Sequence, residues 1–142
     1  MKTLISIAAV IATLATPAFA ASMPNLTGRW KPLGSDDRVM TFKHDKDKIT
    51  IMAPDLSCTL TDLKSEPGDA ASIPSMTASS TCDDESDTIY LKETLSVVRV
   101  GRDLLLIDAA VQVRHVNENV DPKIDESFSN QPAAITIYRK VQ

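Results

Sequence analysis

Apolar and polar residues alternate along most of the chain with a period of two rather than the 3.6-residue period of a helix. Apolar residues share one face of several such runs, namely Leu56, Cys58 and Leu60, Met40 and Phe42, and Ile49 and Ile51. Thr, Val and Ile are frequent in these runs, as is typical of strands. Beyond the first twenty residues no segment carries a helical stripe of useful length, so the pattern predicts an all-β protein.

Turn residues divide the chain into short strands. "HDKDK", "EPGD" and "VGRDL" each separate two alternating runs and predict reversals of the chain. Strands are expected near 26–33, 38–43, 48–53, 56–63, 75–82, 87–92, 94–100, 104–109, 110–116 and 133–141, and some of these must merge. Eight to ten short antiparallel strands in one domain indicate a closed barrel, with a β-sandwich as the alternative.

The first twenty residues have the layout of an export signal. Lys2 precedes an uncharged, mostly apolar run, and Ala18-Phe19-Ala20 has the small-x-small pattern of a cleavage site. The apolar run is short for a membrane span, and no cysteine suited to lipid attachment lies near the cleavage point. We therefore expect a cleaved signal peptide at 1–20, a single domain at 21–142, no membrane anchor, and a periplasmic or secreted protein.

Charge and cysteine content fit this compartment. Cleavage would remove Lys2 and change the net charge of -4 to -5, and an acidic chain argues against nucleic acid as a partner. Cys58 and Cys82 are the two cysteines, and an oxidising compartment favours one disulfide between them.

The segment Leu26-x-Gly28-x-Trp30 resembles the opening of the calycin group, which includes the lipocalins and a bacterial periplasmic metalloprotease-inhibitor family. The resemblance implies a lipocalin-like, antiparallel up-and-down barrel of about eight strands. It also implies structural roles for Gly28 and Trp30 at the closed end of the barrel. An arginine from the last strand would lie across the tryptophan, and Arg139 is the counterpart in this chain.

The inhibitor family implies a more specific function. Its members place an N-terminal tail in the cleft of a secreted protease. The corresponding tail here is Ala21, Ser22, Met23, Pro24 and Asn25. Small residues and a proline suit an extended cleft because they lose little side-chain entropy on binding. The expectation is an exported protein-binding barrel, most sharply a protease inhibitor, and a toxin-immunity or virulence-related interaction belongs to the same class.

The principal alternative is a carrier of a small apolar ligand. In that case the barrel interior would be lined by apolar side chains of alternating strands, namely Met40, Phe42, Ile51, Leu60, Met76 and Ile89. Side chains can also fill an eight-stranded barrel completely, and the sequence leaves both arrangements open.

Motifs for catalysis or metal binding are not apparent. The acidic run "CDDESD" lacks a calcium-loop pattern and is interpreted as a solvated turn. His44 and His115 lie far apart in sequence without a third zinc ligand beside them. There is no Gly-x-Ser-x-Gly elbow. We therefore expect a protein that is not an enzyme, with no cofactor and no metal. The long connection at 117–132, with a short helix possible near 122–127, is expected to be either functional or mobile.

Overall fold

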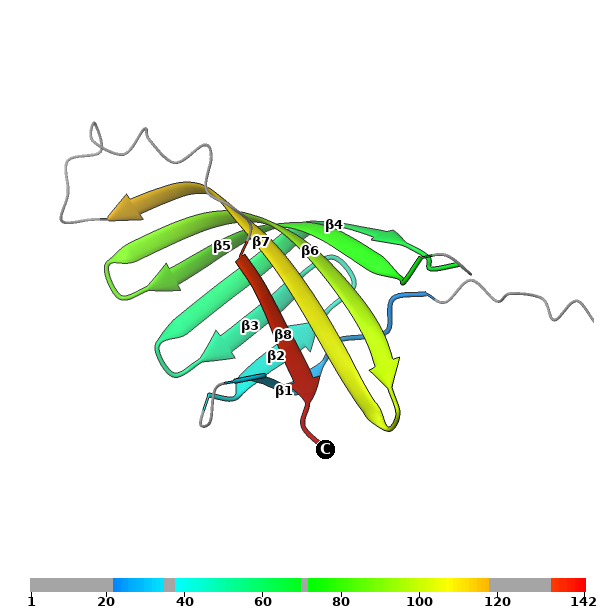
Figure 1. Cartoon of the computed structure of the whole chain (residues 1–142). Coiled ribbons are helices and arrows are strands. Elements are labelled where there is room, and N and C mark those ends of the chain that lie inside the picture. Colours follow the sequence, from blue (N-terminus) through cyan, green and yellow to red (C-terminus); the bar gives the residue numbers. More distant parts are fainter. Residues whose placement is uncertain (1–21, 35–37, 70–71, 118–133) are drawn as a thin grey trace, which may run out of the picture.

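The computed structural model describes residues 22–34, 38–69, 72–117 and 134–142. Within these ranges the chain forms eight strands (Figure 1), namely β1 (Gly28–Pro32), β2 (Met40–His44), β3 (Ile49–Ala53), β4 (Leu56–Glu66), β5 (Ser75–Asp84), β6 (Asp87–Val100), β7 (Asp103–Asn117) and β8 (Ala134–Lys140). The expected signal peptide, residue 21 and the possible helix at 122–127 lie outside the described residues.

Each strand pairs antiparallel with its neighbours in chain order, and β8 returns to β1 to close the barrel. The closing register places Trp30 opposite Lys140 and Pro32 opposite Tyr138. This closed up-and-down barrel confirms the predicted fold class, is compatible with a lipocalin-like fold and excludes the sandwich alternative.

The expected strand merges occur in the second half of the chain. The predicted segments 87–92 and 94–100 form the single strand β6, and 104–109 and 110–116 form β7. Both strands are long and cross the barrel together in Figure 1, with β8 beside them. Because β5, β6 and β7 are longer than β1, β2 and β3, one wall of the barrel extends further than the other.

The barrel is filled from the β1–β4 side by large apolar side chains. Trp30, Phe42, Ile49 and Leu60 are essentially inaccessible to solvent, and the Trp30 and Phe42 ring centroids lie 5.9 Å apart. The predicted inward row is confirmed, because Met40, Phe42, Ile51, Leu60 and Met76 are buried and Ile89 packs against them. This side of the barrel is a solid apolar core.

Cys58 and Cys82 form the expected disulfide. The two residues lie directly opposite each other on β4 and β5, and both side chains are buried. The bridge thus ties the first half of the barrel to the second at a single rung of the sheet.

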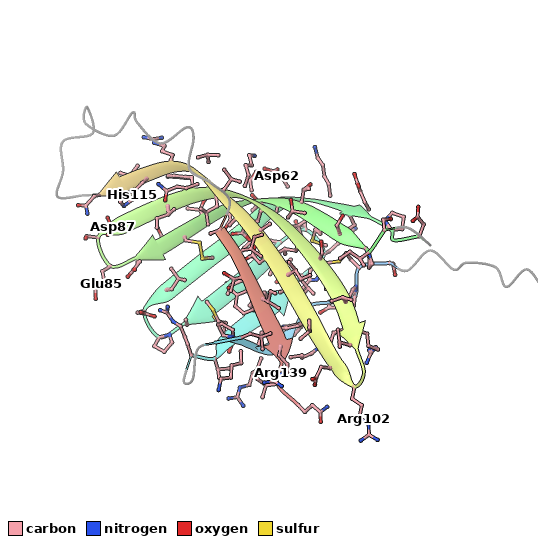
Figure 2. The ribbon with its side chains drawn as sticks, in the orientation of Figure 1. Asp62, Glu85, Asp87, Arg102, His115 and Arg139 are labelled. Carbon is pink, nitrogen blue, oxygen red and sulfur yellow. A yellow bond between two sulfur atoms is a disulfide. The ribbon has the colours of Figure 1, made fainter. Side chains whose placement is uncertain are left out.

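The prediction for Arg139 is wrong, and the neighbouring residue takes its place. Lys140 Nζ lies over the Trp30 ring, 5.5 Å from its centroid. Arg139 points outward with 53% of its side chain exposed and lies 3.9 Å from Asp103, near the β6–β7 turn in Figure 2. Strand alternation explains the difference, because Tyr138 and Lys140 face inward and Arg139 between them must face outward.

Gly28 is structural, as expected, and the reason lies in its backbone. Its φ of 140° is a backbone conformation that residues with a side chain rarely adopt. An added Cβ would also lie 3.1 Å from Lys140 Cε. Glycine here lets Lys140 approach the barrel end beside Trp30.

Candidate binding site in the barrel interior

Two carboxylates face the inside of the barrel. Glu93 on β6 is 4% exposed and Asp108 on β7 is 9% exposed. Each has apolar neighbours in its inward row, with Leu95 next to Glu93 and Leu106 next to Asp108 along the strands. We refer to Glu93 and Asp108 as the acid pair.

The register of the strands places the acid pair close together. Leu95 is directly opposite Asp108, and Glu93 is opposite Ala110, so Glu93 and Asp108 are diagonal neighbours on adjacent strands. Ser80 on β5 occupies the corresponding diagonal position beside Glu93, because Ala78 is the direct partner of Glu93. Tyr138 on β8 occupies it beside Asp108, because Thr136 is the direct partner of Asp108.

Four strands therefore supply one oblique line of polar side chains across the interior wall, in the order Ser80, Glu93, Asp108 and Tyr138. Ser80 and Tyr138 are buried as well, at 3% and 8% exposure. The Tyr138 ring packs edge-on against Phe42 at 5.8 Å, which joins the polar line to the apolar core.

The acid pair is not fully hydrogen-bonded. Glu93 Oε2 and Asp108 Oδ1 are both inaccessible to solvent and have no hydrogen-bond partner. None of the ion pairs found among the described residues involves either carboxylate. Buried polar atoms are normally paired, so two unpaired oxygens on diagonally neighbouring residues mark an unusual place in the fold.

Burial and mutual repulsion shift the protonation of this group. Burial raises the pKa of Asp108 to about 7, and the negative charge of Glu93 adds to the shift. Burial also raises the pKa of Glu93, while the Ser80 hydroxyl opposes that change. The pKa of Tyr138 rises to about 12 through burial and the two carboxylates, so its phenol stays neutral.

The inward-facing side chains of β7 and β8 become more exposed to solvent toward the end of the barrel where β6 begins and β7 ends. We call this end the open end. Beyond the acid pair, Ala110, Gln112 and Thr136 are half-buried and Ala134 is exposed, and register places all of them on the inward face. Three of these four side chains are small, so the inner surface beyond the acid pair projects little into the barrel and is partly accessible to solvent.

A separate groove lies on the outer surface of the same wall. It has a volume of about 560 Å³ and is lined by side chains of β4–β7 that include Asp62, Lys64, Thr77, Thr94 and Val111. Ala78 and Glu93 also contribute to its lining, so the groove lies against the stretch of sheet that carries the interior site. Lys92 Nζ donates a hydrogen bond to Ser79 Oγ there at 2.6 Å.

The described part of the predicted N-terminal tail, residues 22–25, largely packs against the barrel or is hydrogen-bonded to it. Residue 21 is outside the described part of the chain, Ser22 is exposed, and Met23 packs against the core. Asn25 Nδ2 donates to the His44 carbonyl at 3.1 Å, and the Leu26 N–H donates to His44 Nδ1 at 3.2 Å. His44 is thus half-buried rather than freely exposed, and burial lowers its pKa.

The acidic run after Cys82 forms the β5–β6 hairpin at the open end, where Figure 2 shows Glu85, Asp87 and His115. Asp87 Oδ1 lies 2.9 Å from His115 Nε2 and accepts a hydrogen bond from Asn117 Nδ2 at 2.6 Å. No group of three or more His, Cys, Asp or Glu side chains that could hold a metal occurs in the described part of the chain. Nor do these residues form a helix long and apolar enough to cross a membrane.

The acid pair, Ser80 and Tyr138 were not among the candidate residues from sequence. A signal for them exists, since Glu93 and Asp108 each stand in a strand where the residues two positions away are apolar. An acidic residue in such a row is expected to face the core and not solvent.

Comparison with known proteins adds no assignment. The chain matches no family model, no curated protein and no solved structure. Its function must therefore be argued from the barrel and its interior.

Proposed function

We propose that the chain is an exported binding protein whose barrel interior holds a small ligand at the acid pair. The observation that carries the proposal is the pair of buried, unpartnered oxygens, Glu93 Oε2 and Asp108 Oδ1. A barrel that served only as a rigid scaffold would gain stability from apolar residues at these positions, since burying an unpaired charge is costly. Groups kept at such a cost are typical of binding sites.

The position of the pair supports the same conclusion. It lies between the packed aromatic core, represented by Phe42 and Tyr138, and the small inward residues of the open end, represented by Ala110 and Ala134. A ligand entering from the open end would meet small side chains first and the carboxylates next. Ligand sites commonly combine such an apolar wall with a few convergent polar groups.

A fluorescent apolar probe tests this proposal. N-phenyl-1-naphthylamine, which is uncharged at neutral pH, should gain fluorescence with the mature protein. The inward substitution Ala110→Phe should weaken its binding roughly tenfold or more, because the new ring would occupy the inward position directly opposite Glu93. The matched control is Ala109→Phe, one residue away on the outward face, which should bind the dye as the unsubstituted protein does.

Loss in Ala109→Phe alone, equal loss in both variants, or no loss in either would mean that the dye binds the outside of the barrel, where Ala109 lines the groove. Both substitutions add the same ring to the same strand, so their difference isolates the interior.

A protein partner is the second candidate, and one observation favours it. Four large apolar side chains on β7 and β8 are exposed to solvent, namely Val111, Val113, Ile135 and Ile137. Exposed apolar groups that gather on one surface commonly mark interaction sites. The protease-inhibitor version of this function is tested by deleting residues 21–25, which should abolish inhibition of secreted metalloproteases and leave dye binding unchanged.

A further inference from the structure

The acid pair has the composition of a cation site. Both carboxylates project from the same wall, neither has a basic partner among the described residues, and each keeps one oxygen without a hydrogen bond. Two basic side chains have partners elsewhere, since Lys140 lies over Trp30 and Arg38 pairs with Asp55. The charge that would balance the pair is therefore not supplied by these side chains.

We propose that the ligand of this barrel is a protonated primary amine with an apolar body, its ammonium group bound between Glu93 and Asp108. This inference rests on the proposed function and specifies the class of ligand. A primary ammonium has three N–H donors and no acceptor. The wall offers acceptors in matching number, the two orphan carboxylate oxygens and the hydroxyl oxygen of Tyr138 beside Asp108.

The surroundings of the pair favour an organic ammonium over a metal ion. Calcium takes six to eight oxygen ligands and zinc prefers nitrogen or sulfur. The wall presents two carboxylates and three hydroxyls, those of Ser80, Thr136 and Tyr138, and no histidine or further acid joins them among the described residues. Hydrogen bonds between ions are strong where water is excluded, so a single ammonium would be held well here.

The apolar body of the ligand is accommodated by the neighbouring side chains. Leu91 and Leu95 flank Glu93 on the inward face of β6, and Phe42 and Met76 lie on the inward faces of β2 and β5. Toward the open end, the small side chains of Ala110 and Thr136 fill little of the barrel interior. An amine with an unbranched alkyl chain or one aromatic ring matches this combination.

The test compares ligands that differ only in their head group. Octylamine, octan-1-ol and octanoate are titrated into the mature protein at neutral pH, and binding is followed by calorimetry and by displacement of N-phenyl-1-naphthylamine. Octylamine should bind roughly tenfold or more tightly than octan-1-ol, and octanoate should bind least. The series needs no substitution, so it gives an answer even where a variant fails to fold.

Substitutions at the acid pair test whether its carboxylates are the groups that select the ammonium. Glu93→Gln with Asp108→Asn preserves the shape of the wall and should remove the preference for octylamine over octan-1-ol. Asp84→Asn removes an exposed acid from the end of β5 and should preserve that preference.

Each remaining outcome has a separate meaning. Equal affinity for octylamine and octan-1-ol would overturn the amine assignment and leave the proposed interior site standing. Calcium chloride that raises the melting temperature and prevents octylamine binding would overturn it in favour of a metal site. Failure of all three compounds and of the dye to bind would overturn the amine assignment together with the proposed function.

Discussion

At the scale of single residues, strand alternation decides what each side chain does. Arg139 and Lys140 are adjacent cations, yet only Lys140 reaches the Trp30 ring, because inward and outward positions alternate along β8. Arg139 shares one face of β8 with Ile135 and Ile137, and the exposure of both isoleucines shows that this is the outer face. A periodicity defines two faces without indicating which of them is buried, and family resemblance chose the wrong one.

The two cations should accordingly differ in their contribution to stability. Lys140→Met should lower the free energy of unfolding by about 0.5–1 kcal/mol, the range for a partly exposed cation over an aromatic ring. Arg139→Met should change it by less than about 0.5 kcal/mol, since its pairing with Asp103 is exposed. Urea denaturation of both variants measures the difference, and a larger loss for Arg139→Met would contradict the assignment.

Asp108 should give the ligand-free protein an unusual pH dependence. Its pKa is about 7 in the folded protein against 3.8 for a free side chain, so between these values the folded state binds more protons than the unfolded state. Its effect on stability is thus most favourable below about pH 4 and is lost as pH rises through about 7.

Asp108→Asn should remove this loss, because the amide carries no charge to bury. The variant should therefore be more stable than the unsubstituted protein at pH 8 and gain least near pH 4. Urea midpoints across this range, with Asp84→Asn as the control, measure the effect. A variant less stable than the unsubstituted protein at pH 8 would mean that the Asp108 carboxylate is stabilised by a partner.

At the scale of elements, the strands follow from local pattern and the site from register. All eight strands correspond to predicted alternating runs, since alternation is a property of neighbouring residues. The predicted segments 87–92 and 94–100 omitted only Glu93, the residue at the centre of the site. Three consecutive polar residues, Lys92, Glu93 and Thr94, resemble a break in an apolar row. Only the pairing of β6 with β7 shows that Glu93 lies opposite Ala110 inside the barrel.

The disulfide is the element-scale feature whose removal has the largest expected effect. Cys58 and Cys82 are separated by 24 positions and joined across β4 and β5. The double variant Cys58→Ala and Cys82→Ala should lose about 3 kcal/mol of unfolding free energy, mainly because the unfolded chain regains the freedom of that loop.

Denaturation of the double variant measures this loss, and the unsubstituted protein under reducing conditions serves as its control. Unchanged stability in both samples would mean that the pairing of β4 with β5 needs no covalent support.

At the scale of the whole molecule, the barrel combines an apolar core with one line of polar side chains. Both halves of the chain supply the core, for example Trp30 and Phe42 from β1 and β2 and Leu95 and Leu106 from β6 and β7, while β5–β8 also bring Ser80, the acid pair and Tyr138 to the interior. Period-two patterns and the number of short strands predict an all-β barrel, and the family resemblance added the expectation of an up-and-down order of about eight strands. The polar line was missed because it depends on the register of four neighbouring strands, β5–β8, which the sequence pattern does not specify.

The central claim is that the interior beside the acid pair holds a small molecule. Native mass spectrometry of the protein, purified without denaturation from the cells that produce it, tests it most directly. The account predicts a mass above that of the disulfide-bonded polypeptide, with the excess lost on denaturation and absent from the Ala110→Phe variant. A mass equal to the polypeptide alone, together with no binding of added octylamine or dye, would contradict the account and indicate a barrel that functions through its surface.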